Sequence, residues 1–259
     1  MKLDVENKTI DEKIKLYNGD CLEILKYISD KSVDLVIIDP PYELESERGG
    51  GLFSNNNPNK RQYQNEISNM MNGISNETLD LLGSKMKKIN MYIFCSRTQM
   101  LNLLNYAKDN NYSWNLLMWH KTNPIPTCNN KYLNDTEYIV YMREKGVKIY
   151  GNYHTKKTYF MTPINKADKK EFNHPTIKPL EIIKNLIINS SNENDIVLDC
   201  FMGSGTTGVA CKELKRNFIG IELNEKYFEI AKKRIEEKNN QATIFGYIDN
   251  NAIKENEVI

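Results

Sequence analysis

A chain of 259 residues, 27% of them charged and 40% hydrophobic, has the composition of an ordinary soluble globular protein. It is long enough to bury a substantial core, either as one large α/β domain or as a core with a modest insertion. The net charge of +1 argues neither for nor against nucleic acid, because a basic face can be balanced by an acidic back. The polar first residues and the short apolar runs predict neither a secretory signal nor a membrane span.

The use of cysteine indicates a reducing compartment. Five widely scattered cysteines form no Cys-x-x-Cys pair, and three histidines complete no metal-ligand cluster with them. We therefore expect reduced, mostly buried thiols, no metal site and a cytoplasmic location.

Apolar runs alternate with helical patterns along most of the chain. In chain order, the patterns predict a short edge strand at residues 14–17, a strand at 33–38, a helix at 77–88, a strand at 91–95, helices at 98–110 and 180–189, a strand at 196–198, a helix at 206–214, a strand at 218–221 and a helix at 224–238. The main strands are apolar at nearly every position, which is typical of strands buried on both faces of a parallel sheet. This alternation favours a doubly wound α/β sheet.

Two segments break the alternation. Residues 43–64 contain a run of glycines and then a run of asparagines before a proline, with no hydrophobic period, and we expect them to form a mobile loop. Residues 123–172 are rich in tyrosine and lysine, with a hairpin strand expected at 137–142. Residues 121–172 hold ten Lys and Arg against five Asp and Glu, which gives this part of the chain an excess of positive charge.

The first site motif is Asp39-Pro40-Pro41-Tyr42, directly after the strand at 33–38. A strand of an open α/β sheet delivers its end to the carboxyl edge, where such folds build their sites. The turn offers a carboxylate, proline carbonyls and an aromatic ring within four residues. A strand-terminating turn with an incidental acid is the alternative interpretation.

The motif suits methylation of an exocyclic amine on a nucleic acid base. Such an amine is a poor nucleophile, because its lone pair is delocalised into the ring. The Asp39 carboxylate and the Pro40 carbonyl are two acceptors that could bind its two hydrogens and favour a pyramidal nitrogen. Tyr42 could then stack on the face of an extruded base.

A second motif, residues 199–207, follows the strand at 196–198. Its sequence predicts a strand, a glycine turn and a helix, and Gly203 and Gly205 allow the backbone to approach a ligand closely. A lone Gly-x-Gly is weak evidence, but the next strand ends in Glu222, about twenty residues beyond the turn, from where α/β nucleotide binders hold a ribose diol. Asp199, at its strand tip, could bind an amine or a ribose. The chain has no P-loop, and a nucleoside fits this pair as well as a dinucleotide.

Two further motifs are ambiguous by themselves. Asp20 follows the strand at 14–17, where it could hold the adenine of a nucleoside cofactor or could cap a helix over residues 21–27. The run His174-Pro175-Thr176-Ile177-Lys178-Pro179 precedes a predicted helix and could be only a loop stopped by proline.

Together, these motifs resemble those of the DNA amino-methyltransferases, which make N6-methyladenine or N4-methylcytosine. Asp39-Pro40-Pro41-Tyr42 looks like their catalytic tetrapeptide, residues 199–207 look like their cofactor loop, and Glu222 looks like the acid that holds the ribose hydroxyls. The run from His174 to Pro179 is similar to the segment that lies over the methionine moiety, and Trp119-x-Lys121-x-Asn123-Pro124 also resembles a family stretch. The tetrapeptide precedes the cofactor loop, which is the circularly permuted order of the beta group.

The resemblance implies a Rossmann-like, mostly parallel sheet of seven strands that transfers a methyl group from S-adenosylmethionine to a base flipped out of duplex DNA. Asp at the first tetrapeptide position leans toward adenine N6. The implied catalytic residues are Asp39, Pro40, Pro41 and Tyr42. The implied cofactor contacts are Asp20, His174, Thr176, Lys178, Asp199, Phe201, Gly203, Ser204, Gly205, Thr206, Thr207 and Glu222.

The resemblance also divides the chain. Residues 1–122 form the catalytic half of the core, residues 173–259 form the cofactor half, and the insertion at 123–172 is the small target-recognition region. DNA contacts are expected from Lys121, Asn123, Lys131, Lys156 and Lys157. A second copy of the chain and a cognate restriction endonuclease are further partners that the resemblance leaves open.

Several alternatives remain at this stage. N4-cytosine methylation keeps the mechanism, and RNA or a glutamine amide are other substrates for it. A catalytically silent DNA-binding protein on the same fold is a different class, and a nicotinamide dehydrogenase would leave Asp39 and Tyr42 unexplained. Cytosine C5 methylation is excluded, because it typically uses a Pro-Cys pair and none of the eight prolines precedes a cysteine.

Overall fold

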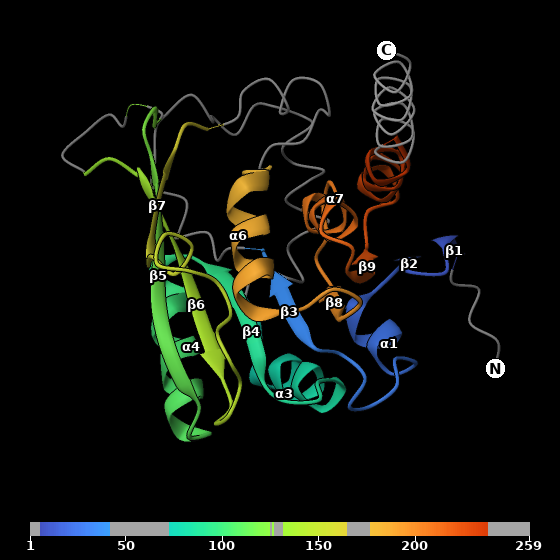
Figure 1. Cartoon of the computed structure of the whole chain (residues 1–259), viewed down its shortest axis with the longest axis horizontal. Helices are drawn as coiled ribbons and strands as arrows, with labels where there is room; N and C mark the ends of the chain where they lie inside the picture. Colours follow the sequence, from blue (N-terminus) through green and yellow to red (C-terminus); the bar gives the residue numbers. More distant parts are fainter. Residues whose placement is uncertain (1–5, 42–72, 125, 127–131, 165–176, 238–259) are drawn as a thin grey trace, which may run out of the picture.

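The computed structural model describes residues 6–41, 73–124, 126, 132–164 and 177–237. These residues form one nine-stranded sheet in the order β1-β2-β9-β8-β3-β4-β6-β5-β7 (Figure 1). The strands are β1 (Glu6–Asp11), β2 (Ile14–Asn18), β3 (Leu35–Ile38), β4 (Asn90–Cys95), β5 (Ser113–Lys121), β6 (Thr136–Arg143), β7 (Tyr159–Thr162), β8 (Ile196–Asp199) and β9 (Asn217–Glu222).

Seven of the strands, from β2 to β5 in the sheet order, form the mostly parallel core that the sequence predicts. Within it, only β6 is antiparallel, and it lies between β4 and β5. Two short strands extend this core, β1 antiparallel to β2 and β7 parallel to β5. The prediction of an edge strand at residues 14–17 is therefore wrong, because β2 is paired on both sides and β1 is the edge.

Helices cover both faces of the sheet, as a doubly wound fold requires (Figure 1). One face carries α6 (Leu180–Ser190), α7 (Thr206–Glu213) and the helical residues 225–237. The other face carries α1 (Cys21–Leu25), α3 (Asn76–Lys85) and α4 (Arg97–Asp109). The core is thus two apolar layers separated by one sheet.

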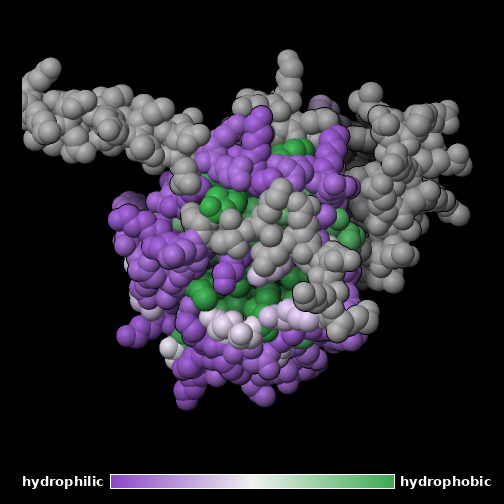
Figure 2. Space-filling view, turned by 90° about the vertical axis from the view of Figure 1, so that its right-hand side faces the viewer, coloured by the Kyte–Doolittle hydropathy of each residue, from purple (hydrophilic) through white to green (hydrophobic). Residues whose placement is uncertain are grey.

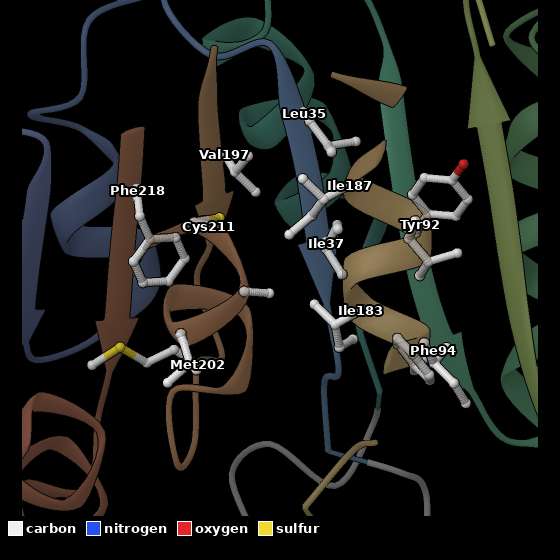
Figure 3. Close-up of a cluster of buried hydrophobic side chains, with 14 of the residues drawn as sticks. Leu35, Ile37, Tyr92, Phe94, Ile183, Ile187, Val197, Met202, Cys211 and Phe218 are labelled. Carbon is white, nitrogen blue, oxygen red and sulfur yellow. The ribbon is translucent and has the colours of Figure 1, made fainter. Parts of the chain in front are cut away.

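Strand β3 shows why the central strands are apolar at nearly every position. Leu35 and Ile37 belong to the layer under α6 and α7, whereas Val36 and Ile38 belong to the layer on the opposite face. Successive side chains of a strand point to opposite faces, so a strand covered on both faces needs no polar position. Figure 3 shows Leu35 and Ile37 packed with side chains from the neighbouring strands and from α6.

The predicted helices are found, with corrected ends. The predicted helix at 77–88 begins at Asn76, where the Ser75 hydroxyl accepts from the Thr78 N–H as a cap. It ends at Lys85, because Met86 is extended and forms a parallel bridge with Val33. Pairing with the sheet therefore ends this helix earlier than its hydrophobic period indicates.

The segment expected to read the target contributes to the sheet itself. Residues 123–172 contain β6, in the interior of the sheet, and β7 at its edge. The expected hairpin strand at 137–142 is the centre of β6. The expected mobile loop at 43–64 lies outside the described residues.

The face of the molecule that Figure 2 shows is mostly hydrophilic. Figure 2 views the molecule from the β1 side, where hydrophobic residues gather near the middle of a polar face. No helix within the described ranges is long and apolar enough to cross a membrane.

Candidate active site

The carboxyl ends of β8 and β3 lie side by side at the point where the winding of the sheet reverses. From β8 the chain continues through α7 to β9 on one side, and from β3 it reaches β4 on the other. Ligands of open α/β sheets bind in the crevice at such a switch point. Asp199 ends β8 and Asp39 follows β3, so both predicted site motifs meet there.

In the turn after β3, the Pro41 carbonyl is bound by a side chain of the protein, whereas the Pro40 carbonyl is bound by none of the described residues. The Pro41 carbonyl accepts a hydrogen bond of 2.9 Å from Nε2 of Gln99, which is itself buried in the capping box of α4. No described residue donates to the carbonyl of Pro40, the predicted acceptor for an amine. Tyr42, the fourth residue of the tetrapeptide, lies outside the described residues.

The glycine turn after β8 is held by the side-chain carboxylate of Asp199. Asp199 Oδ1 accepts from the Phe201 N–H at 3.1 Å, and Oδ2 accepts from the Thr207 hydroxyl at 2.6 Å. Gly203 and Gly205 have φ of +50° and +78°, a region that favours glycine. At Gly205 a side chain would also meet the Cβ of Ala231 at 2.8 Å. The glycines are therefore needed for this turn, as the sequence predicts.

Glu222 closes the same turn from the end of β9. Its Oε2 accepts from the Gly203 N–H at 2.8 Å, and its Oε1 accepts from the Asn224 N–H at 2.9 Å. A carboxylate offers about four lone-pair directions. Glu222 can therefore hold the loop and still accept hydrogen bonds from hydroxyl groups of a ligand.

Burial dominates the electrostatics of these two acids. It raises the pKa of Asp199 to about 7, against the hydrogen bonds from Thr207 and Phe201 and with a further rise from the charges of Asp39 and Glu222. Burial also raises the pKa of Glu222, while its backbone hydrogen bonds lower it. The switch point is thus an acidic site that a bound cation or hydroxyl donor would stabilise.

Three predicted cofactor residues already have structural partners. Arg234, from the helical residues 225–237, donates to the Ser204 carbonyl and, at 2.8 Å, to the Ser204 hydroxyl, and it lies 3.4 Å from the Thr206 hydroxyl. The Thr207 hydroxyl is the donor to Asp199. The side chains of Ser204, Thr206 and Thr207 therefore hold the loop in place through contacts with Arg234 and Asp199.

Asp20 caps a helix at the same edge. Its Oδ1 accepts from the Leu22 N–H at 2.9 Å and the Glu23 N–H at 3.2 Å, at the start of α1. The two strands that carry Asp20 and Glu222 are in register, and the Gly19 N–H donates to the Glu222 carbonyl at 3.0 Å. The capping alternative is therefore correct, and the residue is also adjacent to the Glu222 end of the site.

Lys178, just before α6, contacts the turn after β3. Its ammonium is 2.6 Å from Asp39 Oδ2 and 3.0 Å from Glu137 Oε2, and its side chain is only 8% exposed. The resemblance implies a cofactor contact for this residue. The other residues implied from the same motif, His174 and Thr176, lie outside the described residues.

The predicted DNA contacts do not form one surface. The Lys121 ammonium pairs with Glu137 Oε1 at 2.8 Å and is largely buried, and Asn123 Oδ1 accepts from the Ile164 N–H. Lys156 and Lys157 are exposed, but the adjacent Thr155 carbonyl accepts from Asn189, in the last turn of α6. That turn lies at the far end of the helix from Lys178. Lys131 lies outside the described residues.

Three site residues were not predicted from the sequence: Gln99, Glu137 and Arg234. Glu137 begins β6, and because β6 is antiparallel its first residues lie beside the carboxyl end of β4. A polar residue at the start of a predicted antiparallel strand was the available signal. The capping box could have identified Gln99, whereas Arg234 lies in an ordinary helical pattern.

No group of three or more His, Cys, Asp or Glu side chains in the described part of the chain could hold a metal ion. The four described cysteines, Cys21, Cys95, Cys200 and Cys211, are free and buried, as predicted.

Buried carboxylates, a glycine turn and a turn with acceptor groups meet at one switch point, which is where α/β enzymes of this architecture bind their ligands. The chain belongs to the N6/N4 methyltransferase family, described as DNA methylase, whose model matches residues 33–233. The resemblance drawn from the motifs is thereby confirmed, and so is the prediction that the protein is a DNA methyltransferase.

Curated relatives cover most of the chain. The type II methyltransferase M2.LlaDCHI of Lactococcus lactis subsp. cremoris is 32% identical over 245 residues, which is 86% of this chain and 90% of that protein. The type II methyltransferase M2.MboI of Moraxella bovis is 29% identical over 246 residues, 88% of this chain and 89% of that protein.

Solved structures share the fold. The structure of the M1.HpyAVI–SAM complex has a TM-score of 0.64 and 30% identity, covering 86% of this chain and 98% of that one. The PvuII DNA methyltransferase, named as cytosine-N4-specific, has a TM-score of 0.66 at 18% identity over 92% of this chain and 94% of its own, which shows the fold alone. The predicted fold class is confirmed.

Proposed function

We propose that the protein transfers a methyl group from S-adenosylmethionine to the exocyclic N6 of adenine, at a specific sequence in duplex DNA. The observation that carries this proposal is that Asp39 and Asp199 end the adjacent strands β3 and β8 at the switch point. A turn suited to an amine therefore lies beside a turn suited to a nucleoside. The family resemblance supplies the choice of adenine, because Asp at the position of Asp39 favours adenine over cytosine as the target base.

The cofactor half of the site matches the chemistry of S-adenosylmethionine. The cofactor offers hydroxyl and ammonium donors and no phosphate, and residues 199–207 contain two glycines and an acid but no Lys or Arg. Glu222 is the acceptor for ribose hydroxyls, and Asp199 is a buried carboxyl that a nearby cation would hold ionised. When bound, the cofactor supplies a methyl group on a sulfonium, which is an electrophile.

The base half of the site activates and orients the amine. The Asp39 carboxylate and the Pro40 carbonyl would accept its two hydrogens and leave the nitrogen lone pair free to attack. The bound cofactor would supply the methyl group, and its sulfur would keep the electron pair of the broken C–S bond. The nitrogen then loses a proton to solvent. No covalent intermediate with the protein is needed, so positioning and electrostatics supply most of the rate enhancement.

A base inside a duplex cannot reach this turn. The Asp39 side chain lies at the carboxyl edge of the sheet and is only 25% exposed. The target adenine must therefore be extruded from the base stack to reach it. Stacking of Tyr42 on the extruded base belongs to this proposal. Phosphate contacts of the basic segment belong to this proposal as well, with the support of its local positive charge. Lys121 is held by Glu137, and Lys156 and Lys157 adjoin the end of α6 far from Lys178, which leaves Asn123 and Lys131 as the contacts proposed from the expected set.

The proposal extends to place and partners. The enzyme acts in the cytoplasm, where buried free thiols such as Cys95 and Cys211 stay reduced. Because relatives are named type II methyltransferases, a restriction endonuclease that cleaves the same unmethylated sequence is the expected companion. A homodimer is a further expectation, which sedimentation of the protein alone would test.

The deciding experiment is methyl transfer from labelled S-adenosylmethionine to unmethylated DNA, followed by nucleoside digestion and mass spectrometry. We expect N6-methyladenine at one short recognition sequence. N4-methylcytosine would keep the mechanism and overturn the base. Cofactor binding without any labelled product, on several DNAs of different sequence, would instead favour RNA, a protein or a silent binder.

A further inference from the structure

Four charged side chains of alternating sign lead away from the catalytic turn. Lys178 lies between Asp39, at 2.6 Å, and Glu137, at 3.0 Å, and Lys121 lies on the far side of Glu137, at 2.8 Å. The four residues come from the end of β3, the entry to α6, the start of β6 and the end of β5. Four separate parts of the chain therefore meet in one line of ion pairs.

The line is buried, so its charges depend on one another. The side chains of Lys178, Glu137 and Lys121 are 8%, 16% and 13% exposed. Burial opposes the charge of Lys178, but the carboxylates of Asp39 and Glu137 outweigh this and raise its pKa. Burial likewise opposes the charge of Glu137, but Lys178 and Lys121 lower its pKa to about 2. Removing one partner would leave an uncompensated buried charge.

The surroundings restrict where the Lys178 ammonium can go. It lies 5.1 Å from the centre of the Phe94 ring, on β4, which gives it a cation–π contact in addition to its two carboxylates. The Lys121 ammonium lies in the same way 5.4 Å from the Trp119 ring. Each lysine is thus held by a carboxylate and an aromatic face.

We propose that Lys178 and Glu137 are positioning residues for Asp39, a role that rests on the proposed function. Lys178 fixes Asp39 through Oδ2 and keeps the carboxylate an acceptor for the amine of the base. Glu137 fixes Lys178 in turn, so that the ammonium is shared between two carboxylates. Lys121 completes the line by holding Glu137.

This role differs from a cofactor contact, and the difference is measurable. If Lys178 served the cofactor, its replacement would weaken binding of S-adenosylmethionine. If Lys178 serves Asp39, cofactor affinity stays within about threefold of wild type while kcat falls. Glu137 adds a second arm to the test, because its carboxylate contacts the same Lys178 ammonium that pairs with Asp39.

The pH profile gives a readout that a merely structural role would not move. Asp39 is faced by Lys178, by Glu137 beyond it, by the Asp199 carboxyl on β8 and by the Cys95 thiol on β4. A nearby cation favours an ionised carboxylate, so removing the Lys178 charge makes Asp39 protonate at higher pH. Removing the Glu137 charge has the opposite sign, because one negative neighbour is lost.

The test uses the full chain with the conservative variants Lys178→Gln, Lys178→Arg and Glu137→Gln. Lys184→Gln is the matched control, because Lys184 lies on α6 but pairs with Glu213, away from Asp39. We would measure kcat at saturating DNA and cofactor from pH 5 to 9, and the cofactor Kd by calorimetry. Thermal unfolding would confirm that each variant is folded.

We expect kcat to fall about 100-fold in Lys178→Gln and about 10-fold in Glu137→Gln, at unchanged cofactor Kd. The acid limb of the kcat profile should move to higher pH in Lys178→Gln only, and Lys178→Arg should restore its position. A Glu137→Gln protein with wild-type kcat and profile would overturn the proposal, as would a loss of cofactor affinity in Lys178→Gln. If Glu137→Gln does not fold, the contrast between Lys178→Gln and Lys178→Arg still decides. Wild-type protein without methylated product would instead overturn the proposed function.

Discussion

The two halves of the proposed site are built in different ways. The cofactor half is the turn after β8 with Glu222, and the base half is the turn after β3 with Lys178 and Glu137. In the cofactor half, Asp199 and Glu222 are held by neutral donors, which are backbone N–H groups and one hydroxyl, all within residues 199–224. In the base half, Asp39 is held by an ion pair to Lys178, which is 139 residues away in the chain and is shared with Glu137. One half is local in sequence and the other is assembled by the fold.

The difference has an electrostatic consequence. Neutral donors do not offset burial, so the pKa of Asp199 rises to about 7. Two ammonium groups more than offset burial at Glu137, and its pKa falls to about 2. Asp199 therefore changes its charge near neutral pH in the free protein, whereas Glu137 stays ionised there.

The largest effect should come from the base half. Asp39→Ala removes the carboxylate that accepts from the amine, and we expect methylation to fall by about 1,000-fold or more, a loss of at least about 4 kcal/mol of transition-state stabilisation. Cofactor Kd should change little, because Asp39 serves the base. Single-turnover assays and calorimetry measure the two separately. Loss of cofactor binding in a folded Asp39→Ala protein would remove the distinction between the halves.

In the cofactor half, the titration of Asp199 should make the free energy of unfolding depend on pH. Because burial raises the pKa of Asp199 from 3.8 to about 7, the folded state retains a proton that the unfolded state releases. Its contribution is fully present below about pH 4 and is lost as the pH rises through 7, by up to about 4 kcal/mol.

Asp199→Asn has no such proton, so its free energy of unfolding should fall less than that of wild type between pH 5 and pH 8. Denaturant unfolding at both values measures the difference of the two slopes, in which the titration of all other groups cancels. Parallel slopes would mean that Asp199 is solvated in the free protein.

The sequence predicted the cofactor half of the site better than the base half. Asp199, the glycines and Glu222 were found because their strand, turn and helix signals lie within 24 residues, and the structure joins them as expected. The partners of Asp39 were not found. Glu137 and Lys178 belong to different elements, and only the strand order, with β6 antiparallel beside β4, brings them together.

The fold shows the same limit in its outer strands. The core strands were predicted because burial on both faces leaves β3 fully apolar and β4 nearly so, with Asn90 at its first position. Strand β5 was not, because its first three residues, Ser113, Trp114 and Asn115, are exposed and hide its period. Strand β1 carries the polar sequence ENKTID, and only its pairing with β2 makes it a strand.

A smaller effect is expected at Glu222. Glu222→Ala removes the acceptor for the ribose hydroxyls and also releases the N–H of Gly203, so we expect cofactor Kd to rise by about 10- to 100-fold. At saturating cofactor, kcat should recover most of its wild-type value, because the base half is unchanged. The exposed Glu236→Ala is the control. A fall in kcat that cofactor cannot restore would show that the two halves are coupled.

The smallest effect should come from the lysines that lie far from both halves. Lys156 and Lys157 were predicted to contact phosphates, but they adjoin Thr155, which is tied to Asn189 at the end of α6 opposite Lys178. An 11-residue helix is about 16 Å long, so DNA docked over Asp39 has to extend past it to reach them.

We expect Lys156→Ala to change DNA affinity by less than about twofold at 50 mM salt, like the exposed control Lys215→Ala. A larger loss with a lower salt dependence, about one unit of slope per lost contact, would instead mean that the duplex runs along α6. That result would place the recognition surface on the β7 side of the sheet and bring Lys157 back as a phosphate contact.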